Sequence, residues 1–316
     1  MRAAVVTRTD GPEAVEILDL PEPVGDLLVD VHAVGISFPD LLLSRGEYQL
    51  KPETPFTLGV DFAGVVRNDG GGFKAGDRVA GCAPYGGAAE TVSAMADFLF
   101  PLPARVSLIQ GAAIPMNYLT ADFALAERAD LQPGETVLVH GAAGGVGTAT
   151  IQVAKAMGAR TIAVVSSEAK AAVAREAGAD EVVLADGFRE SVQALTPQGV
   201  NVVMDVVGGD LMTDSLRCLA PQGRLLVVGF AGGGIPEVKV NRLLLNNIDV
   251  RGVGWGAFAM TRPGYMRQQW ARLLPAMESG VIDPAVVDVR PLAEIGSALM
   301  DMQQRRTLGK TVLTLR

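Results

Sequence analysis

Cysteine and histidine are scarce in this chain. Its 316 residues include two cysteines, Cys82 and Cys218, and two histidines, His32 and His140. Two cysteines cannot build a disulfide framework or a four-cysteine zinc lobe, and the four side chains together match no metal-ligand spacing. The composition therefore predicts a protein without a metal site, in a reducing compartment such as the cytoplasm.

Positive charge is also in deficit. Lysine and arginine number 27 against 35 acidic residues, which gives a net charge of −8 and a pI near 4.9. An acidic surface does not favour phosphate backbones, so nucleic acid is not an expected partner. A membrane partner is not expected either, because the uncharged stretch 136–154 carries four glycines and several polar side chains. The N-terminal MRAAVVTRTDG lacks the apolar core of a secretory leader.

Glycine is abundant, at 37 residues, and it separates the predicted strands and helices in two regions of different character. The first hundred residues contain short apolar runs between proline, glycine and aspartate turns, which predicts a β-rich domain. From about residue 122 strands and helices alternate, which predicts a doubly wound parallel sheet over residues 123–262. The tail after residue 262 is too short to fold alone. We therefore expect a discontinuous β-rich domain, 1–122 with 263–316, around an α/β domain.

The strongest motif lies between the first strand and helix of the α/β region. A buried strand at 136–140 runs into Gly-Ala-Ala-Gly-Gly-Val-Gly, a dinucleotide fingerprint with alanine at its first position. A pyrophosphate can approach the backbone at Gly144, and Gly147 lets the helix pack closely on the strand. The predicted cofactor contacts in this turn are Gly144, Gly145, Val146 and Gly147. The helix is expected to bury one face, made of Val146, Ala149, Thr150, Val153 and Met157.

With these residues in view, the chain resembles the medium-chain dehydrogenase/reductase family, most closely its zinc-free quinone oxidoreductase branch. The resemblance is carried by HGAAGGVGTATIQVAKAMGA (140–159), VGISFPDLLLSRGEYQLKPETPFTLGVDFAGVV (34–66), AGDRV (75–79), NYLTADFAL (117–125), DVVGG (205–209) and GKTVL (309–313). It implies a GroES-like catalytic domain built from both termini and an inserted Rossmann domain. The implied activity is NADPH-dependent hydride transfer to a quinone or an α,β-unsaturated carbonyl.

The same resemblance bears on zinc and on the substrate. In the zinc-dependent branch a cysteine ligand stands at the Ser37 position and a histidine at Val60; serine is a weak zinc ligand and valine is none. The quinone reductases usually carry asparagine at Ser37, glutamate at Asp61 and a tyrosine near Ala185. These departures leave the branch intact and the substrate open.

Cofactor choice depends on the tip of the second Rossmann strand. Ser166, Ser167 and Lys170 could hold a 2′-phosphate, whereas Glu168 could accept a hydrogen bond from the 2′-hydroxyl of NAD. A plainer interpretation makes Ser167 a helix cap and Lys170 a solvated side chain. The family resemblance favours NADP(H). The residues expected near the nicotinamide are Thr120, Val207, Gly208, Gly229, Phe230 and Ala231.

Hydride addition to a quinone or an α,β-unsaturated carbonyl places negative charge on the substrate oxygen, which needs a hydrogen-bond donor. By resemblance the donors are Ser37, Tyr48 and Asn117, and Asp40 is expected to hold the ribose or a proton path. Both histidines are expected to be structural.

Two further functions remain open. The first is a 2-enoyl thioester reductase with a phosphate-binding patch formed by Arg242, Arg251, Arg262 and Arg267. The second is a cofactor-binding structural or regulatory protein without activity. A strand at 248–254 is expected at the edge of the Rossmann sheet, where an unprotected strand invites pairing, and this predicts a homodimer.

Overall fold

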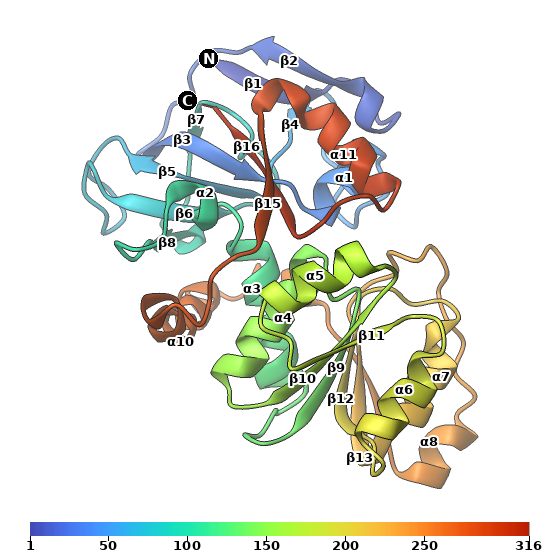
Figure 1. Cartoon of the computed structure of the whole chain (residues 1–316). Helices are drawn as coiled ribbons and strands as arrows, with labels where there is room; N and C mark the ends of the chain where they lie inside the picture. Colours follow the sequence, from blue (N-terminus) through green and yellow to red (C-terminus); the bar gives the residue numbers. More distant parts are fainter. Residues whose placement is uncertain (316) are drawn as a thin grey trace. The chain divides into compact units, whose positions relative to one another are not determined.

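The computed structural model describes residues 1–315, which form two compact units (Figure 1). Unit 1 comprises Met1–Asn117, Pro263–Leu274 and the segment from Val286 to the end of the described chain; unit 2 comprises Tyr118–Arg262 and Pro275–Ala285. The structure has the predicted β-rich unit, built from both ends of the chain, and the predicted doubly wound parallel sheet.

The boundaries of the units differ from the expected ones at two places. Residues 118–122 and the segment Pro275–Ala285 belong to unit 2. Both are tied to Gln152: Tyr118 Oη donates to its Oε1 at 2.7 Å, and its Nε2 donates to the carbonyl of Asp283 at 2.7 Å. These bonds connect residues far apart in sequence, which no local pattern reveals.

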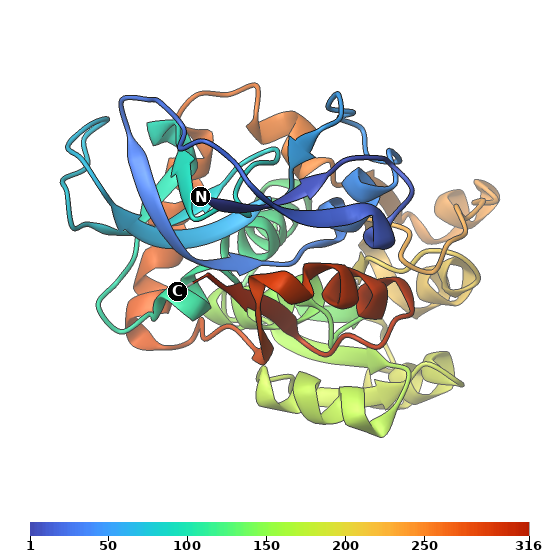
Figure 2. The same cartoon turned by 90° about the horizontal axis from the view of Figure 1, so that it is seen from above.

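The main sheet of unit 1 uses both ends of the chain. Its strand order is β15-β16-β3-β5-β6-β8, with β7 beside β3, and a smaller sheet has the order β2-β1-β4. Strand β16 pairs antiparallel with β3, with Leu313 opposite Val34, so the C-terminal segment (red in Figure 2) completes the sheet of the N-terminal region. The strands are β1 (Arg2–Val6), β2 (Val15–Asp19), β3 (Leu28–Gly35), β4 (Phe56–Thr57), β5 (Asp61–Val66), β6 (Arg78–Cys82), β7 (Thr91–Ser93), β8 (Leu99–Pro101), β15 (Val286–Pro291) and β16 (Lys310–Thr314).

Few helices accompany these strands. Helix α1 begins because Ser37 and Asp40 form a capping box, in which the Ser37 amide donates to Asp40 Oδ2 at 2.9 Å. Helix α11, which the sequence did not predict, buries Ile295 and Leu299 in the core of unit 1. The helices outside unit 2 or at its borders are α1 (Phe38–Ser44), α2 (Leu108–Gly111), α3 (Pro115–Asp122), α10 (Tyr265–Ser279) and α11 (Ile295–Gln303), with 3-10 turns at Pro12–Ala14, Ala96–Phe98 and Leu292–Glu294.

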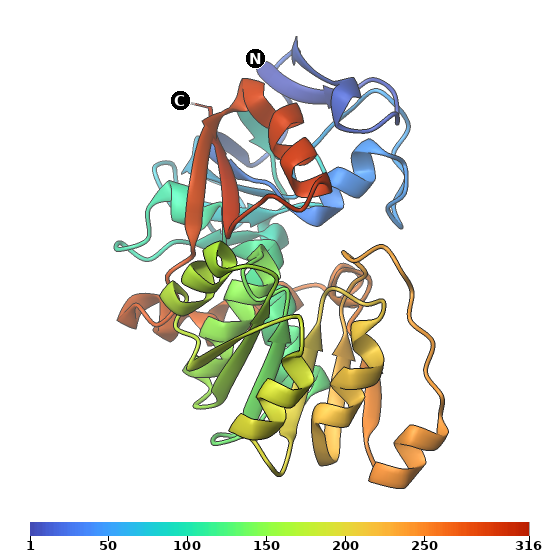
Figure 3. The same ribbon diagram turned by 45° about the vertical axis from the view of Figure 1, so that its right-hand side comes forward.

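Unit 2 is built on six parallel strands in the order β11-β10-β9-β12-β13-β14. They are β9 (Thr136–His140), β10 (Arg160–Val165), β11 (Glu181–Leu184), β12 (Val200–Asp205), β13 (Leu219–Val227) and β14 (Asp249–Gly252). The helices are α4 (Gly145–Ala156), α5 (Glu168–Glu176), α6 (Phe188–Leu195), α7 (Leu211–Cys218), α8 (Asn241–Asn246) and α9 (Trp255–Ala259), with a π-helix at Phe123–Arg128. Helices α4 and α5 cover one face of the sheet, and α6 and α7 cover the other (Figure 3).

Helix α4 is more enclosed than its sequence predicts. All residues from Gly147 to Ala154 are buried, not the single expected face, and Val146 and Met157 are only half-buried. The extra burial follows from its neighbours, because α4 packs on β9, β10, α5 and the π-helix Phe123–Arg128. The threonines on α4 tolerate this enclosure because their hydroxyls bond to the helix, as Thr150 Oγ1 does to the Val146 carbonyl at 2.7 Å.

No helix among residues 1–315 is both long enough and apolar enough to span a membrane.

Candidate functional site

A buried ion pair joins three distant segments of unit 1. Ser37 precedes α1, Asp61 begins β5 and Lys310 begins β16. The Lys310 ammonium donates to Ser37 Oγ at 2.6 Å and to Asp61 Oδ2 at 2.7 Å, and the Ser37 hydroxyl donates to Asp61 Oδ2 at 2.8 Å. None of the three is more than 4% exposed. We call these residues the Lys310 cluster.

The cluster changes what Ser37 can do. A hydroxyl carries one proton, and Ser37 gives it to Asp61 while its oxygen accepts from Lys310. Ser37 therefore does not have a proton left for a substrate oxygen, against its expected role as a donor. Sequence reasoning assigned no role to Lys310, because its two partners lie 273 and 249 residues away along the chain.

Asp40 lies under α1 and binds backbone. Its Oδ2 accepts from the Ser37 amide at 2.9 Å, and its Oδ1 accepts from the amides of Gly59 and Val60 at 3.0 and 3.2 Å. The side chain has no exposed surface, so it offers no face to a ribose in this structure. Burial raises the pKa of Asp40 to about 7, although the amide bonds oppose the rise. The carboxyl can therefore exchange a proton near neutral pH.

Tyr48 and Cys82 belong to the same charged environment. Burial, the Cys82 thiol and the Asp40 carboxyl together raise the pKa of Tyr48, so its phenol is a neutral donor at physiological pH. Burial and then the Asp61 carboxylate hold the pKa of Cys82 well above its ordinary value, so this thiol is inert. Asn117 is buried on α3 and donates weakly to the Ala113 carbonyl at 3.5 Å.

The residues at the zinc positions do not fit the metal. Val60 is apolar and 1% exposed, and Ser37 is occupied by Lys310. Over the described residues, no group of three or more histidine, cysteine, aspartate or glutamate side chains could hold a metal ion. An ammonium ion pair stands where a zinc ligand would be required.

In unit 2 the two glycines of the fingerprint have different surroundings. A Cβ added at Gly144 would have Gly141 O as its nearest neighbour, at 3.4 Å, so space remains beside this residue. A Cβ added at Gly147 would lie 2.3 Å from Gly141 O and 2.6 Å from Ala142 Cα. Gly147 therefore serves close packing, whereas the open side of Gly144, at the N-terminus of α4, suits a pyrophosphate.

The tip of β10 carries the predicted 2′-phosphate residues. Ser166 Oγ lies 3.0 Å from Lys170 Nζ; Ser166 is exposed and Lys170 is half-buried. Ser167 caps α5 by accepting from the Lys170 amide at 3.4 Å. Glu168 lies 3.7 Å from the guanidinium of Arg175, on the solvated side of α5. The Ser166 and Lys170 side chains are already paired at a place where a phosphate could bind.

The predicted nicotinamide contacts lie on turns after β12 and β13. The amides of Val207 and Gly208 donate to Asp205 Oδ1 at 2.8 and 2.9 Å, a role that the sequence did not assign to Asp205. The turn at Gly229, Phe230 and Ala231 is bonded to this one, since Ala231 N donates to the Val206 carbonyl at 3.1 Å. Thr120 is buried on α3.

The four arginines proposed for a CoA phosphate patch are not assembled within one unit. Arg251 donates to Asp249 and to the Arg128 carbonyl, and the guanidinium of Arg262 lies 3.6 Å from the centre of the Phe258 ring. Arg267 belongs to unit 1, where its guanidinium lies over Phe73. The structure gives the thioester hypothesis no specific support.

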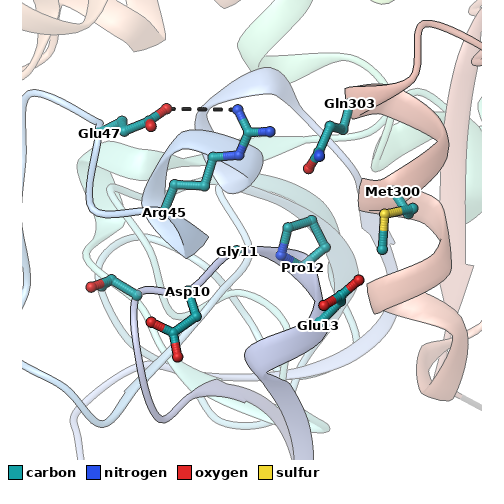
Figure 4. Close-up of a pocket in the computed structure, with 9 residues that line it drawn as sticks. Asp10, Gly11, Pro12, Glu13, Arg45, Glu47, Met300 and Gln303 are labelled. Carbon is teal, nitrogen blue, oxygen red and sulfur yellow. Dashed lines mark ion pairs between the residues drawn. The ribbon is translucent and has the colours of Figure 1, made fainter.

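Unit 1 also contains an open pocket of about 500 Å³ that includes none of the predicted site residues (Figure 4). Its walls come from the turn after β1, from the end of α1 and from α11, and Arg45 lies 3.6 Å from Glu47 across one side. The pocket is lined by Thr9, Asp10, Gly11, Pro12, Glu13, Arg45, Glu47, Met300 and Gln303.

Comparison with known proteins covers the chain from end to end. Residues 23–104 match the alcohol dehydrogenase GroES-like domain, and residues 145–279 match the domain described as a zinc-binding dehydrogenase. Quinone oxidoreductase-like protein 2 of Rattus norvegicus is 40% identical over 100% of this chain and 92% of its own length. A probable oxidoreductase from Mycobacterium abscessus has 41% identity, a TM-score of 0.90 and coverage of 100% and 99% of the two chains. The quinone oxidoreductase from Thermus thermophilus, solved also in complex with NADPH, has 36% identity, a TM-score of 0.87 and full coverage of both chains.

Proposed function

Because the chain belongs to the zinc-free quinone oxidoreductase branch of the medium-chain dehydrogenase/reductase family, we propose that it is an NADPH-dependent reductase of quinones or α,β-unsaturated carbonyls. The observation that carries the proposal is the Lys310 cluster, which fills the zinc position with a buried ammonium ion. Without a metal Lewis acid, such a chain suits acceptors that take a hydride at carbon and need only a hydrogen bond at oxygen.

NADPH, when bound, supplies the hydride. In this proposal Gly144, Gly145, Val146 and Gly147 bind the pyrophosphate through the turn and the α4 N-terminus, and Ser166 with Lys170 binds the 2′-phosphate. Support comes from the open side of Gly144, from the Ser166–Lys170 pair and from the NADPH complex of the Thermus thermophilus relative. Thr120, Val207, Gly208, Gly229, Phe230 and Ala231 would hold the nicotinamide half.

The substrate oxygen would be met by Tyr48 and Asn117. Tyr48 is the stronger candidate because it is half-buried, its phenol stays protonated and its hydroxyl makes no hydrogen bond with the described residues. Asp40, whose pKa is about 7, would store the proton that completes the reduction. Ser37 would act through the Lys310 cluster rather than by touching the substrate.

A nicotinamide-oxidation assay tests the activity. Purified protein is incubated with NADPH and a panel of one quinone, one enone, one enal and crotonyl-CoA. Turnover of a free quinone, enal or enone supports the proposal, and a strong preference for crotonyl-CoA favours the thioester reductase. Tight NADPH binding with no turnover of any compound favours a structural or regulatory protein.

Tyr48→Phe sharpens the assay. Removal of an oxyanion donor lowers kcat about 100-fold in comparable sites, and we expect this loss with NADPH affinity unchanged. Tyr85→Phe is the matched control, because Tyr85 lies in the same unit, is 41% exposed and packs against Phe56. Equal kcat for Tyr48→Phe and Tyr85→Phe would remove Tyr48 from the mechanism.

We also propose that the protein is a homodimer joined at β14. This strand ends the order of the Rossmann sheet, and the segment before it exposes four large apolar side chains at 73–78%: Ile235, Val240, Leu244 and Leu245. A second copy pairing with β14 would cover them.

Sedimentation equilibrium should give twice the chain mass of 33.0 kDa. Leu244→Glu should shift the protein to the monomer, while Leu184→Glu, at the opposite edge strand β11, should not. A wild-type mass near 33.0 kDa at micromolar concentration would refute the dimer.

We also propose a cytoplasmic location, which the small number of cysteines in the sequence, two in 316 residues, favours.

A further inference from the structure

The Asp61 carboxylate has a further partner outside the Lys310 cluster. Its Oδ2 accepts from Ser37 and Lys310, whereas its Oδ1 accepts from the Met116 amide at 2.8 Å. Met116 is the second residue of α3, and the bond joins residues 55 positions apart in the chain. Asp61 has no exposed surface, so both of its oxygens are bonded inside unit 1.

The first turn of α3 has no capping side chain of its own. Ile114 precedes the helix, and before it come Ala112 and Ala113; none of the three has a side-chain oxygen. An N-cap side chain ordinarily accepts from the amide of the second or third helical residue. The Asp61 carboxylate takes this place from strand β5, and its negative charge suits the positive end of the helix.

A glycine brings the chain before α3 against the Lys310 cluster. A Cβ added at Gly35, the last residue of β3, would lie 2.0 Å from the Ala112 carbonyl oxygen and 2.8 Å from Lys310 Cε. The Ala112 backbone and the Lys310 side chain can therefore lie this close to β3 only because Gly35 has no side chain. The segment that leads into α3 is both packed against the cluster and bonded to it.

Helix α3 carries Asn117, one of the two donors proposed for the substrate oxygen. Asn117 follows Met116 directly and is 5% exposed. Its side-chain amide donates to the Ala113 carbonyl at 3.5 Å, a long bond that constrains the side chain little. The direction of the Asn117 side chain therefore depends on how the first turn of α3 is placed.

Stability alone does not account for the buried ion pair at the start of α3, because a well-packed apolar pair is often as stable. We propose that Asp61 is a positioning residue: its carboxylate anchors Met116 at the start of α3 and so directs Asn117 toward the substrate oxygen, while Lys310 compensates the charge. The inference rests on the proposed reductase function, in which Asn117 meets that oxygen.

Two double variants isolate the bond to Met116. Asp61→Asn/Lys310→Met removes both charges and keeps a carbonyl oxygen for the Met116 amide. Asp61→Leu/Lys310→Met removes both charges and that oxygen with a side chain of similar shape. With the quinone or enone that the wild type reduces best, kcat at saturating NADPH should stay within about twofold of wild type for the first and fall about tenfold for the second. NADPH affinity should be equal in the two.

Asn117→Ala shows whether the effect passes through Asn117. This substitution should itself lower kcat. Adding Asp61→Leu/Lys310→Met to it should lower kcat no further, because the group that Asp61 positions is gone. A merely structural Asp61 would instead give a lower Tm with unchanged kcat, or losses of kcat that add to that of Asn117→Ala.

Hydrogen exchange of the Met116 amide in the cofactor-free protein reports the bond without an activity assay. Exchange should be slow in the wild type and with Asp61→Asn/Lys310→Met, and at least about tenfold faster with Asp61→Leu/Lys310→Met. The Val66 amide is the control: it lies at the other end of β5, is bonded to the Asp77 carbonyl at 2.9 Å and should exchange equally in all three. If Asp61→Leu/Lys310→Met does not fold, Asp61→Asn/Lys310→Met decides, since it must keep slow Met116 exchange and near-normal kcat.

Three results would overturn the inference: equal Met116 exchange in the two double variants, equal kcat in the two, or a loss of kcat from Asp61→Leu/Lys310→Met that persists in full beside Asn117→Ala. A wild type that reduces no quinone, enal or enone would instead refute the proposed function. Met116 exchange would then still test the bond between Asp61 and α3.

Discussion

The two candidate regions differ in the kind of group that carries the chemistry. In unit 1 the chemistry rests on charged side chains with almost no exposed surface, held by one another and by backbone amides. In unit 2 it rests on backbone turns, with the open side of Gly144 and the solvent-accessible bond between Ser166 and Lys170 as its points of contact. A change in unit 1 should therefore act first on stability and proton affinity, and a change at the exposed positions of unit 2 should act first on the cofactor.

The largest effect is expected at Lys310. Lys310→Met leaves the Asp61 carboxylate buried beside an apolar side chain, and breaking a buried ion pair in this way costs about 3–5 kcal/mol. Urea denaturation measures the loss. Lys74→Met is the matched control, because it breaks an ion pair of similar length, 2.8 Å, whose side chains are 76% and 60% exposed. We expect no measurable loss there, and equal losses for both variants would contradict the assignment of a buried cluster.

Asp40 should make the stability of unit 1 depend on pH. Its pKa is about 7 when folded against 3.8 for an ordinary aspartate, so the folded state binds the proton more tightly than the unfolded state. Stability from this group is therefore full below about pH 4 and declines as pH rises through 7, by roughly 4 kcal/mol in total. Asp40→Asn does not titrate, so its deficit relative to wild type should shrink from pH 4 to pH 8.

Denaturation curves at four pH values across this range measure the change in the deficit. Asp10→Asn is the control, because the wild-type side chain is 67% exposed; its free energy of unfolding should differ from that of the wild type by the same amount at every pH. If the difference in free energy of unfolding between Asp40→Asn and the wild type is also the same at every pH, the raised pKa of Asp40 is wrong.

The contrast between the regions also explains what the sequence could predict. The strand Thr136–His140, the glycine turn and the helix after it are consecutive, so their order alone predicted β9, α4 and the fingerprint. The Lys310 cluster joins residues 37, 61 and 310, and no local pattern connects them. The hydrogen bond from the Val207 amide to Asp205 was missed for a different reason. The DVVGG segment was recognised in the sequence, but whether the Asp205 carboxylate points toward the following turn depends on the conformation of that turn.

Gly147 and Gly144 should separate packing from binding inside one turn. Gly147→Ala forces a Cβ to within 2.3 Å of Gly141 O, and we expect a loss of about 3 kcal/mol, the upper part of the range for overpacking. Gly144→Ala meets nothing closer than 3.4 Å, so it should fold normally and weaken NADPH through contact with the pyrophosphate. Thermal unfolding and fluorescence titration measure the two effects, and a normal NADPH affinity in Gly144→Ala would remove the pyrophosphate from this turn.

The phosphate end of the cofactor should respond to single side chains. Lys170→Ala removes one charge-assisted contact, worth roughly 1.5–3 kcal/mol, so NADPH affinity should fall about ten- to a hundredfold. NADH affinity should be nearly unchanged, and Ser166→Asp should reverse the preference by repelling the phosphate. A wild type that prefers NADH, or equal weakening of both cofactors by Lys170→Ala, would favour Glu168 instead.

The smallest effect distinguishes two neighbouring serines. Ser167 accepts from the Lys170 amide at 3.4 Å, a long bond for a helix cap, so Ser167→Ala should cost about 0.5 kcal/mol, the low end for such caps. Ser166 makes its bond with the Lys170 ammonium and none with the α5 backbone, so Ser166→Ala should leave stability unchanged and weaken NADPH. Paired urea midpoints and NADPH titrations give the comparison directly. If both substitutions lowered stability equally and left NADPH affinity unchanged, the serines at the end of β10 would serve only to begin α5. The 2′-phosphate would then have to bind elsewhere.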